Sequence, residues 1–163
     1  MTNVVFPGTF DPITLGHVDL IQRASRIFNH LTVAIAESSS KKTLFSLSER
    51  IELTKSVLSN LDNVEVIGYS NLTIDFLKEQ QIDIMVRGLR NIIDYEYEQQ
   101  LANAYLSQLP HLEIIFLNTK LNYSYISSTI VKDIASHNGN IEQYVPPEVK
   151  SAVIDKIKKL QKK

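Results

Sequence analysis

Short apolar runs of strand length alternate with segments of helical periodicity, and this alternation constrains the fold more than any other feature of the sequence. The strand-like runs cover residues 3–6, 31–36, 64–67, 82–86 and 112–117. Helical spacing predicts helices at about 17–28, 46–59, 73–81, 92–109, 127–137 and from 147 towards the C-terminus. Because parallel strands need crossover connections, which are usually helices, the pattern predicts repeated strand–helix–strand units. We therefore expect an α/β fold with a doubly wound five-stranded parallel sheet.

The composition limits the size and the partners of this fold. The chain has 163 residues, so we expect one domain over residues 1–163, with a C-terminal helix at about 147–161 docked on it. Its 17 basic and 18 acidic residues give a formal net charge of −1, which argues against a nucleic-acid partner. The absence of cysteine excludes disulfides and thiolate metal sites. We expect a cytoplasmic protein without a membrane partner, because no signal peptide or apolar run of spanning length is present.

The segment from Pro7 to His17 links the first predicted strand to the first predicted helix and reads PGTFDPITLGH. In parallel α/β sheets, ligands bind at the carboxyl ends of strands. Gly8 allows a close approach of the backbone to a ligand, and Gly16 allows a phosphate to reach the free amides of the helix start. An imidazole donor from His17 beside these amides suits a phosphoryl group that gains negative charge. A turn-rich loop with a capping histidine would explain a lone Gly-His pair but not the whole string.

Four further stretches could contact phosphates, and they read SSSKK at 38–42, RGLR at 87–90, DYEYE at 94–98 and YSYISST at 123–129. Two arginines that flank a glycine can offer guanidinium forks to phosphate oxygens. Free amides and hydroxyls at a helix start suit the phosphates of a nucleotide. Each stretch also has a structural interpretation: a solvated lysine loop, an arginine–acid pair, an acidic helix face or a helix cap.

Together these segments resemble the phosphopantetheine adenylyltransferase family of the nucleotidyltransferase superfamily. The first loop is similar to the superfamily signature GTFDP…GH, with Thr14 where many members carry the first histidine of HxGH. Residues 87–90 match the family's RGLR motif, and residues 94–98 are similar to its acidic–aromatic segment. The last stretch is similar to the family's WSFISS segment, although Tyr123 replaces the tryptophan. Lys132 stands where other branches of the superfamily carry arginine.

The resemblance implies a Rossmann-like nucleotidyltransferase fold and a specific reaction. The adenylyl group of ATP would pass to 4′-phosphopantetheine by direct in-line displacement, giving dephospho-coenzyme A and pyrophosphate. The implied cofactor is Mg²⁺, held mainly by phosphates and water, and the implied assembly is a homohexamer. Two alternatives are another acceptor within the superfamily, such as nicotinamide mononucleotide, or cytidylyl transfer. A third is a non-catalytic domain that senses nucleotides.

The resemblance also assigns roles to individual residues, with His17 as the catalytic residue and no metal ligand. The implied ATP-binding residues are Thr9, Phe10, His17, Gly88, Leu89, Arg90, Glu98, Tyr123, Ser124, Tyr125, Ile126, Ser127, Ser128 and Thr129. The implied phosphopantetheine-binding residues are Thr9, Lys41, Thr73 and Arg87.

Overall fold

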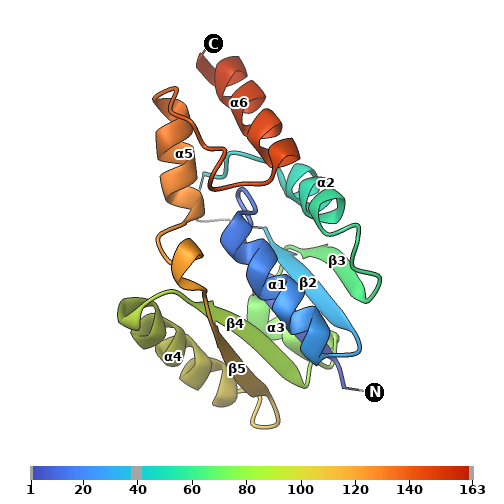
Figure 1. Ribbon diagram of the computed structural model, residues 1–163. Helices are drawn as coiled ribbons and strands as arrows, with labels where there is room; N and C mark the ends of the chain where they lie inside the picture. The colour runs from blue at the N-terminus through green and yellow to red at the C-terminus, as the bar shows by residue number, and fades with distance from the viewer. Residues whose placement is uncertain (1, 38–41, 162–163) are drawn as a thin grey trace.

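The computed structural model describes residues 2–37 and 42–161, and five parallel strands form its centre (Figure 1). These strands are β1 (Val4–Gly8), β2 (Leu31–Ala36), β3 (Val64–Tyr69), β4 (Ile84–Leu89) and β5 (Glu113–Asn118). Their order in the sheet is β3-β2-β1-β4-β5, and every neighbouring pair is parallel. The chain winds outward from β1 in one direction and from β4 in the other, so the topology switches between these two strands. The doubly wound five-stranded parallel sheet is confirmed, and its expected ligand site lies beyond the carboxyl ends of β1 and β4.

Helices cover both faces of the sheet, with α1 and α3 on opposite faces (Figure 1). The helices are α1 (Leu15–Ile27), α2 (Leu47–Val57), α3 (Thr73–Glu79), α4 (Ile92–Leu106), α5 (Ser128–Ser136) and α6 (Pro147–Gln161), with a short 3₁₀ turn η1 at Leu121–Tyr123. None of these described helices combines the length and the apolar character that crossing a membrane requires. The α6 helix packs against α5 and α2.

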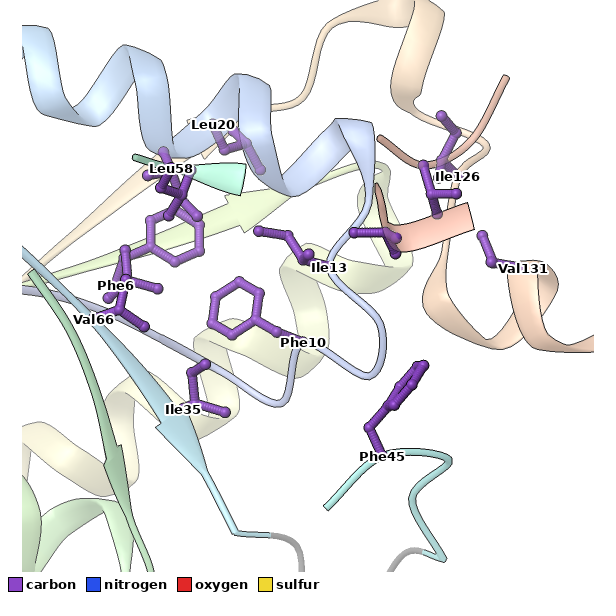
Figure 2. Close-up of a cluster of buried hydrophobic side chains, with 14 of the residues drawn as sticks. Phe6, Phe10, Ile13, Leu20, Ile35, Phe45, Leu58, Val66, Ile126 and Val131 are labelled. Atoms are coloured by element: carbon purple, nitrogen blue, oxygen red, sulfur yellow. The ribbon is translucent and has the colours of Figure 1, made fainter. Parts of the chain in front are cut away.

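Successive side chains along each strand point to opposite faces of the sheet, and they form one hydrophobic core on each face. On β1, Val4 and Phe6 face the core that α1, α5 and α6 cover, whereas Val5 faces the core that α3 covers. Figure 2 shows part of the first core, in which the ring of Phe10 lies near Phe6 and Ile35. Both faces of the central strands are buried, which explains why these strands read as continuous apolar runs rather than as alternating ones.

One strand boundary differs from the prediction in a way that matters for the site. The sequence predicted that the fourth strand ends at Val86, but β4 continues to Leu89, because Arg87, Gly88 and Leu89 pair with the end of β5. Gly88 leaves room for the side chain of Leu20, which a Cβ atom at this position would displace. Arg87 therefore projects from a strand, and its position is fixed by the sheet rather than by a loop.

Candidate active site

A cleft of about 370 Å³ lies over the carboxyl ends of β1 and β4. Its volume falls within the range of small-molecule sites. Most of the residues predicted from the sequence line it: Thr9, Phe10, His17, Arg87, Gly88, Arg90, Glu98, Tyr123, Ile126, Ser127, Ser128 and Thr129. They come from the loop after β1, the start of α1, the end of β4, the α4 helix and the segment that leads into α5.

The loop after β1 is anchored by a buried aromatic side chain. Phe10 is only 3% exposed and has a φ of 47°, in the left-handed region that non-glycine residues rarely adopt. A Cβ atom at Gly8 would lie 2.8 Å from the Phe10 ring, so Gly8 makes room for this ring. The glycine thus serves the packing of the loop, in addition to lining the cleft as the sequence predicted.

His17 is held at the first turn of α1 by a reciprocal cap with Thr14. The Thr14 hydroxyl accepts a hydrogen bond from the His17 backbone N–H at 3.4 Å, and His17 Nδ1 accepts one from the Thr14 backbone N–H at 3.1 Å. The imidazole also packs edge-on against Phe10, with ring centroids 5.0 Å apart. Because Nδ1 accepts a hydrogen bond, the neutral ring carries its proton on Nε2. His17 lines the cleft, so Nε2–H is the donor that it can offer to a ligand there.

The surroundings of His17 keep the imidazole neutral. Burial, followed by the charges of Arg90 and Arg87, lowers the pKa of His17 from 6.5 to about 4. At neutral pH the ring is therefore a neutral hydrogen-bond donor rather than a charged one. A neutral donor can stabilise an oxyanion without giving up a proton.

Two arginines form the opposite wall of the cleft, and α4 holds both of them through carboxylates one turn apart. Arg87 donates from Nε and Nη2 to both oxygens of Glu98, at 2.7 and 2.5 Å, and from Nη1 to the Pro7 carbonyl at 2.8 Å. Arg90 donates to both oxygens of Asp94, at 2.8 and 3.1 Å. The sequence offered an arginine–acid pair as the structural interpretation of the RGLR stretch, but it did not identify Glu98 as the partner of Arg87, because Arg87 lies on a strand.

The start of α5 closes the cleft on a third side. Ser127 is the N-cap, and its hydroxyl accepts a hydrogen bond from the Ile130 N–H at 3.1 Å. The Ser128 hydroxyl donates to the Pro12 carbonyl at 2.8 Å, which joins this helix to the loop after β1. Both hydroxyls therefore have structural partners, while the first-turn amides provide the positive end of the helix dipole.

A sequence model of one protein family, described as cytidylyltransferase-like, matches residues 5–134, which is most of the chain. The chain belongs to the cytidylyltransferase-like family. This result agrees with the nucleotidyltransferase superfamily that the motifs indicated. The matched region contains β1 without its first residue, the strands β2 to β5 and most of α5, and it includes every cleft-lining residue named above.

Solved structures with a similar fold include three adenylyltransferases of low sequence identity. A nicotinic acid mononucleotide adenylyltransferase from Plasmodium falciparum, complexed with NaAD, is 19% identical with a TM-score of 0.70 over 98% of this chain and 96% of that chain. A Vibrio parahaemolyticus protein assigned as a nicotinate-nucleotide adenylyltransferase is 18% identical with a TM-score of 0.70 over 94% and 92%. A bifunctional NMN adenylyltransferase/ADP ribose pyrophosphatase from Francisella tularensis is 17% identical with a TM-score of 0.72, over 95% of this chain and 49% of that chain. These likenesses support the Rossmann-like nucleotidyltransferase fold.

A few predicted site residues lie away from the cleft lining. Leu89, Ser124 and Tyr125 do not contribute to it. Thr73 begins α3, where its hydroxyl lies 3.0 Å from the Tyr69 hydroxyl. Lys41, the predicted contact for the acceptor phosphate, falls outside the described residues.

Several lining residues were not predicted as members of the site, among them Thr14, Tyr97 and Thr119. The position of Thr14 three residues before His17 is typical of a helix cap and could have indicated its place. Thr119 follows the end of β5, and its hydroxyl oxygen is buried without a hydrogen-bond partner among the described residues.

The cleft offers little for a protein-held metal. Among residues 2–37 and 42–161, no group of three histidine, aspartate or glutamate side chains could hold a metal ion. The two carboxylates in the lining, Asp94 and Glu98, are paired with arginines. These two carboxylates do not form a metal cage.

Proposed function

We propose that this chain transfers the adenylyl group of ATP to 4′-phosphopantetheine, forming dephospho-coenzyme A and pyrophosphate. One observation carries the proposal: the neutral imidazole of His17 and two arginine forks line one cleft at the switch point of the sheet. This arrangement suits a reaction in which two phosphate-bearing molecules meet and negative charge builds on one phosphorus.

In the proposed reaction, an oxygen of the acceptor phosphate attacks the α-phosphorus of ATP. The bond from this phosphorus to the oxygen that bridges to the β-phosphate breaks, and its electron pair leaves with pyrophosphate. The acceptor is already an anion, so the step needs no general base. Nε2–H of His17 donates to a non-bridging oxygen of the α-phosphate, and the amides of Thr9 and Phe10 add fixed dipoles. Catalysis then consists of positioning and charge stabilisation, without a covalent enzyme intermediate.

The two ends of the reacting pair are assigned to different parts of the cleft. Arg90 and the amides at Ser127–Thr129 would hold the pyrophosphate end of ATP, with Glu98 as a further ATP contact. Arg87 and Lys41 would neutralise the attacking phosphate, which otherwise repels ATP. We propose that Mg²⁺ arrives bound to the triphosphate, and none of the steps above depends on a protein ligand to it.

Two different acceptor molecules have support from separate observations. The RGLR and DYEYE segments favour 4′-phosphopantetheine. The structural neighbours that are named for nicotinate or nicotinamide mononucleotide favour a mononucleotide instead. Both acceptors end in a phosphate, so the role of His17 is the same for each.

A single assay separates these possibilities. The purified protein is mixed with ATP, Mg²⁺ and one acceptor at a time, pyrophosphate release is measured, and the product is identified by its mass. We expect dephospho-coenzyme A from 4′-phosphopantetheine and little product from either mononucleotide. A dinucleotide product would overturn the acceptor but keep adenylyl transfer, whereas ATP binding without pyrophosphate release would support a sensing domain.

We also propose a homohexamer, for which the exposed apolar side chains of α4 give physical support. Ile92, Ile93 and Tyr97 are 72%, 74% and 61% exposed, although apolar groups on a helix are usually buried. Sedimentation velocity tests the assembly, and Ile93→Asp is expected to lower the observed mass. A monomeric wild-type protein at micromolar concentration would contradict it.

A further inference from the structure

A network of charged side chains lies behind the loop after β1, outside the cleft lining. Its centre is Asp11, which is 3% exposed. One carboxylate oxygen accepts the Phe45 backbone N–H at 3.0 Å. The other accepts the Leu44 N–H at 2.9 Å and the ammonium group of Lys132 on α5 at 2.8 Å. A single carboxylate thus joins the loop, the segment before α2, and α5.

Arg50 on α2 completes this network from the opposite side. Its side chain is one of the largest fully buried groups, at 2% exposure. Nη1 donates to the carbonyls of Thr9 and Ala36 at 2.8 and 2.7 Å, and Nε donates to the Phe45 carbonyl at 3.3 Å. The Phe45 residue is therefore held through its N–H by Asp11 and through its C=O by Arg50. The resulting ring of hydrogen bonds closes on residues 9–11.

This ring encloses a residue whose backbone conformation needs support. Phe10 has a φ of 47°, and such a conformation costs about 1 kcal/mol or more unless its surroundings impose it. Buried charges are themselves weak stabilisers, because desolvation offsets much of their attraction. Fixing the conformation of this loop therefore accounts for the network better than stability alone does.

We propose that Asp11, Arg50 and Lys132 are positioning residues for adenylyl transfer. None of them lines the cleft, so they act through the loop that carries Thr9 and Phe10. Lys132 and the Ser128 hydroxyl attach this loop to α5 at Asp11 and Pro12. The network thereby fixes the amides beside the α-phosphate relative to the helix start that would hold the leaving pyrophosphate. This inference rests on the proposed adenylyl transfer but not on the identity of the acceptor.

The test compares two lysines whose side chains are equally exposed, although Asp11, the partner of Lys132, is buried and Glu142, the partner of Lys150, is exposed. The side chains of Lys132 and Lys150 are both 32% exposed, and each forms one ion pair, with Asp11 at 2.8 Å and with Glu142 at 3.1 Å. Lys132→Met removes the network contact, Lys132→Arg keeps a cation, and Lys150→Met is the control. Turnover is measured with the acceptor that the wild-type protein uses, and ATP affinity is measured by calorimetry.

We expect Lys132→Met to lower kcat by about tenfold or more, since small misplacements of catalytic groups cost up to about 100-fold. ATP affinity should stay within about threefold, Lys132→Arg should recover most of the turnover, and Lys150→Met should match the wild type. If Lys132→Met does not fold, Lys132→Gln carries the same comparison.

Two results would overturn the inference alone. Turnover of Lys132→Met equal to that of Lys150→Met would mean that the network does not position the loop. A loss of ATP affinity in proportion to kcat would make Lys132 a nucleotide ligand instead. A wild-type protein that releases no pyrophosphate with any acceptor would remove the proposed function itself.

Discussion

The two walls of the cleft differ in how firmly the surrounding structure holds them. The wall formed by the β1 loop and α1 has a fixed position, because Phe10 and Thr14 are nearly fully buried and Thr14 caps His17. The opposite wall belongs to α4, whose outer face exposes Ile92 and Ile93. Its arginines are already neutralised by Glu98 and Asp94.

This difference indicates that the first wall serves mainly the chemical step and that the second wall serves mainly ligand binding. A donor that acts in the transition state gains from a fixed position, because no reorganisation is needed when charge develops. Arginine forks that hold a ligand can instead exchange one anionic partner for another, and Arg90 is accessible enough to do so, with 38% of its side chain exposed. Changes to the first wall should therefore alter kcat, and changes to the second wall should alter affinity.

The largest effect is expected at His17. His17→Ala should lower kcat by roughly 10²–10³, the scale for losing one oxyanion donor, with little change in ATP affinity. Steady-state kinetics and calorimetry measure the two quantities separately. Near-normal turnover in this variant, or a loss of ATP affinity in proportion to the loss of kcat, would contradict the assignment of His17 to the chemical step alone.

The next effect concerns stability at acidic pH. The pKa of His17 is about 4 in the folded protein and 6.5 in the unfolded chain. Between these values the unfolded chain binds more protons, so the free energy of unfolding falls as pH drops through this window. The loss attributable to His17 is on the order of 3 kcal/mol at pH 4. Chemical denaturation at several pH values from 7 to 4 gives the free energy of unfolding as a function of pH. This free energy should fall less steeply with decreasing pH in His17→Gln than in the wild type, and identical slopes would contradict the assigned pKa.

Arg90 and Arg87 should each affect the affinity for a different ligand. Arg90→Ala should weaken ATP, and Arg87→Ala should weaken the acceptor, each by about 10–100-fold, as expected for charge-assisted hydrogen bonds. Arg23→Ala is a matched control, because Arg23 pairs with Asp19 and also donates to a backbone carbonyl, but it does not line the cleft. Equal weakening of both ligands by either cleft variant would contradict the assignment of separate ends.

The smallest effects should separate two neighbouring tyrosines that the sequence treated alike. Tyr123 lines the cleft, whereas Tyr125 is 55% exposed and packs against Tyr144. We expect Tyr123→Ala to weaken ATP by up to about tenfold, the scale of losing one stacked aromatic. Tyr125→Ala should change ATP affinity by less than about twofold. A larger loss for Tyr125→Ala, measured by calorimetry, would place the nucleotide further along this segment.

Local patterns in the sequence predicted most of the fold and much of the cleft. The second strand, residues 31–36, was predicted with the bounds that the structure has, because its apolar run is clearly delimited. The capping box at Ser46 and Glu49 is a pattern of the same local kind, since both partners lie within four residues. The end of β4 was wrong, because its last three residues are strand only through pairing with β5.

The interactions that join distant segments could not be predicted in the same way. Arg50 looks like an ordinary solvated charge on a predicted helix, yet its partners are carbonyls of residues 9, 36 and 45. The pairing of Arg87 with Glu98 depends on how α4 lies beside β4, which no local spacing encodes. Such contacts arise from the topology, and the sequence pattern carries information mainly about the elements themselves.

The central claim is that the imidazole of His17 is neutral, carries its proton on Nε2, and contacts the bound nucleotide. Nitrogen-15 NMR of the histidine ring nitrogens at pH 7 tests it directly, with His17→Gln used to assign the signals. We expect the Nε2–H neutral tautomer in the free protein and a shift of its Nε2 signal when ATP is added. A charged ring at pH 7, a proton on Nδ1, or signals that ATP leaves unchanged would contradict the claim.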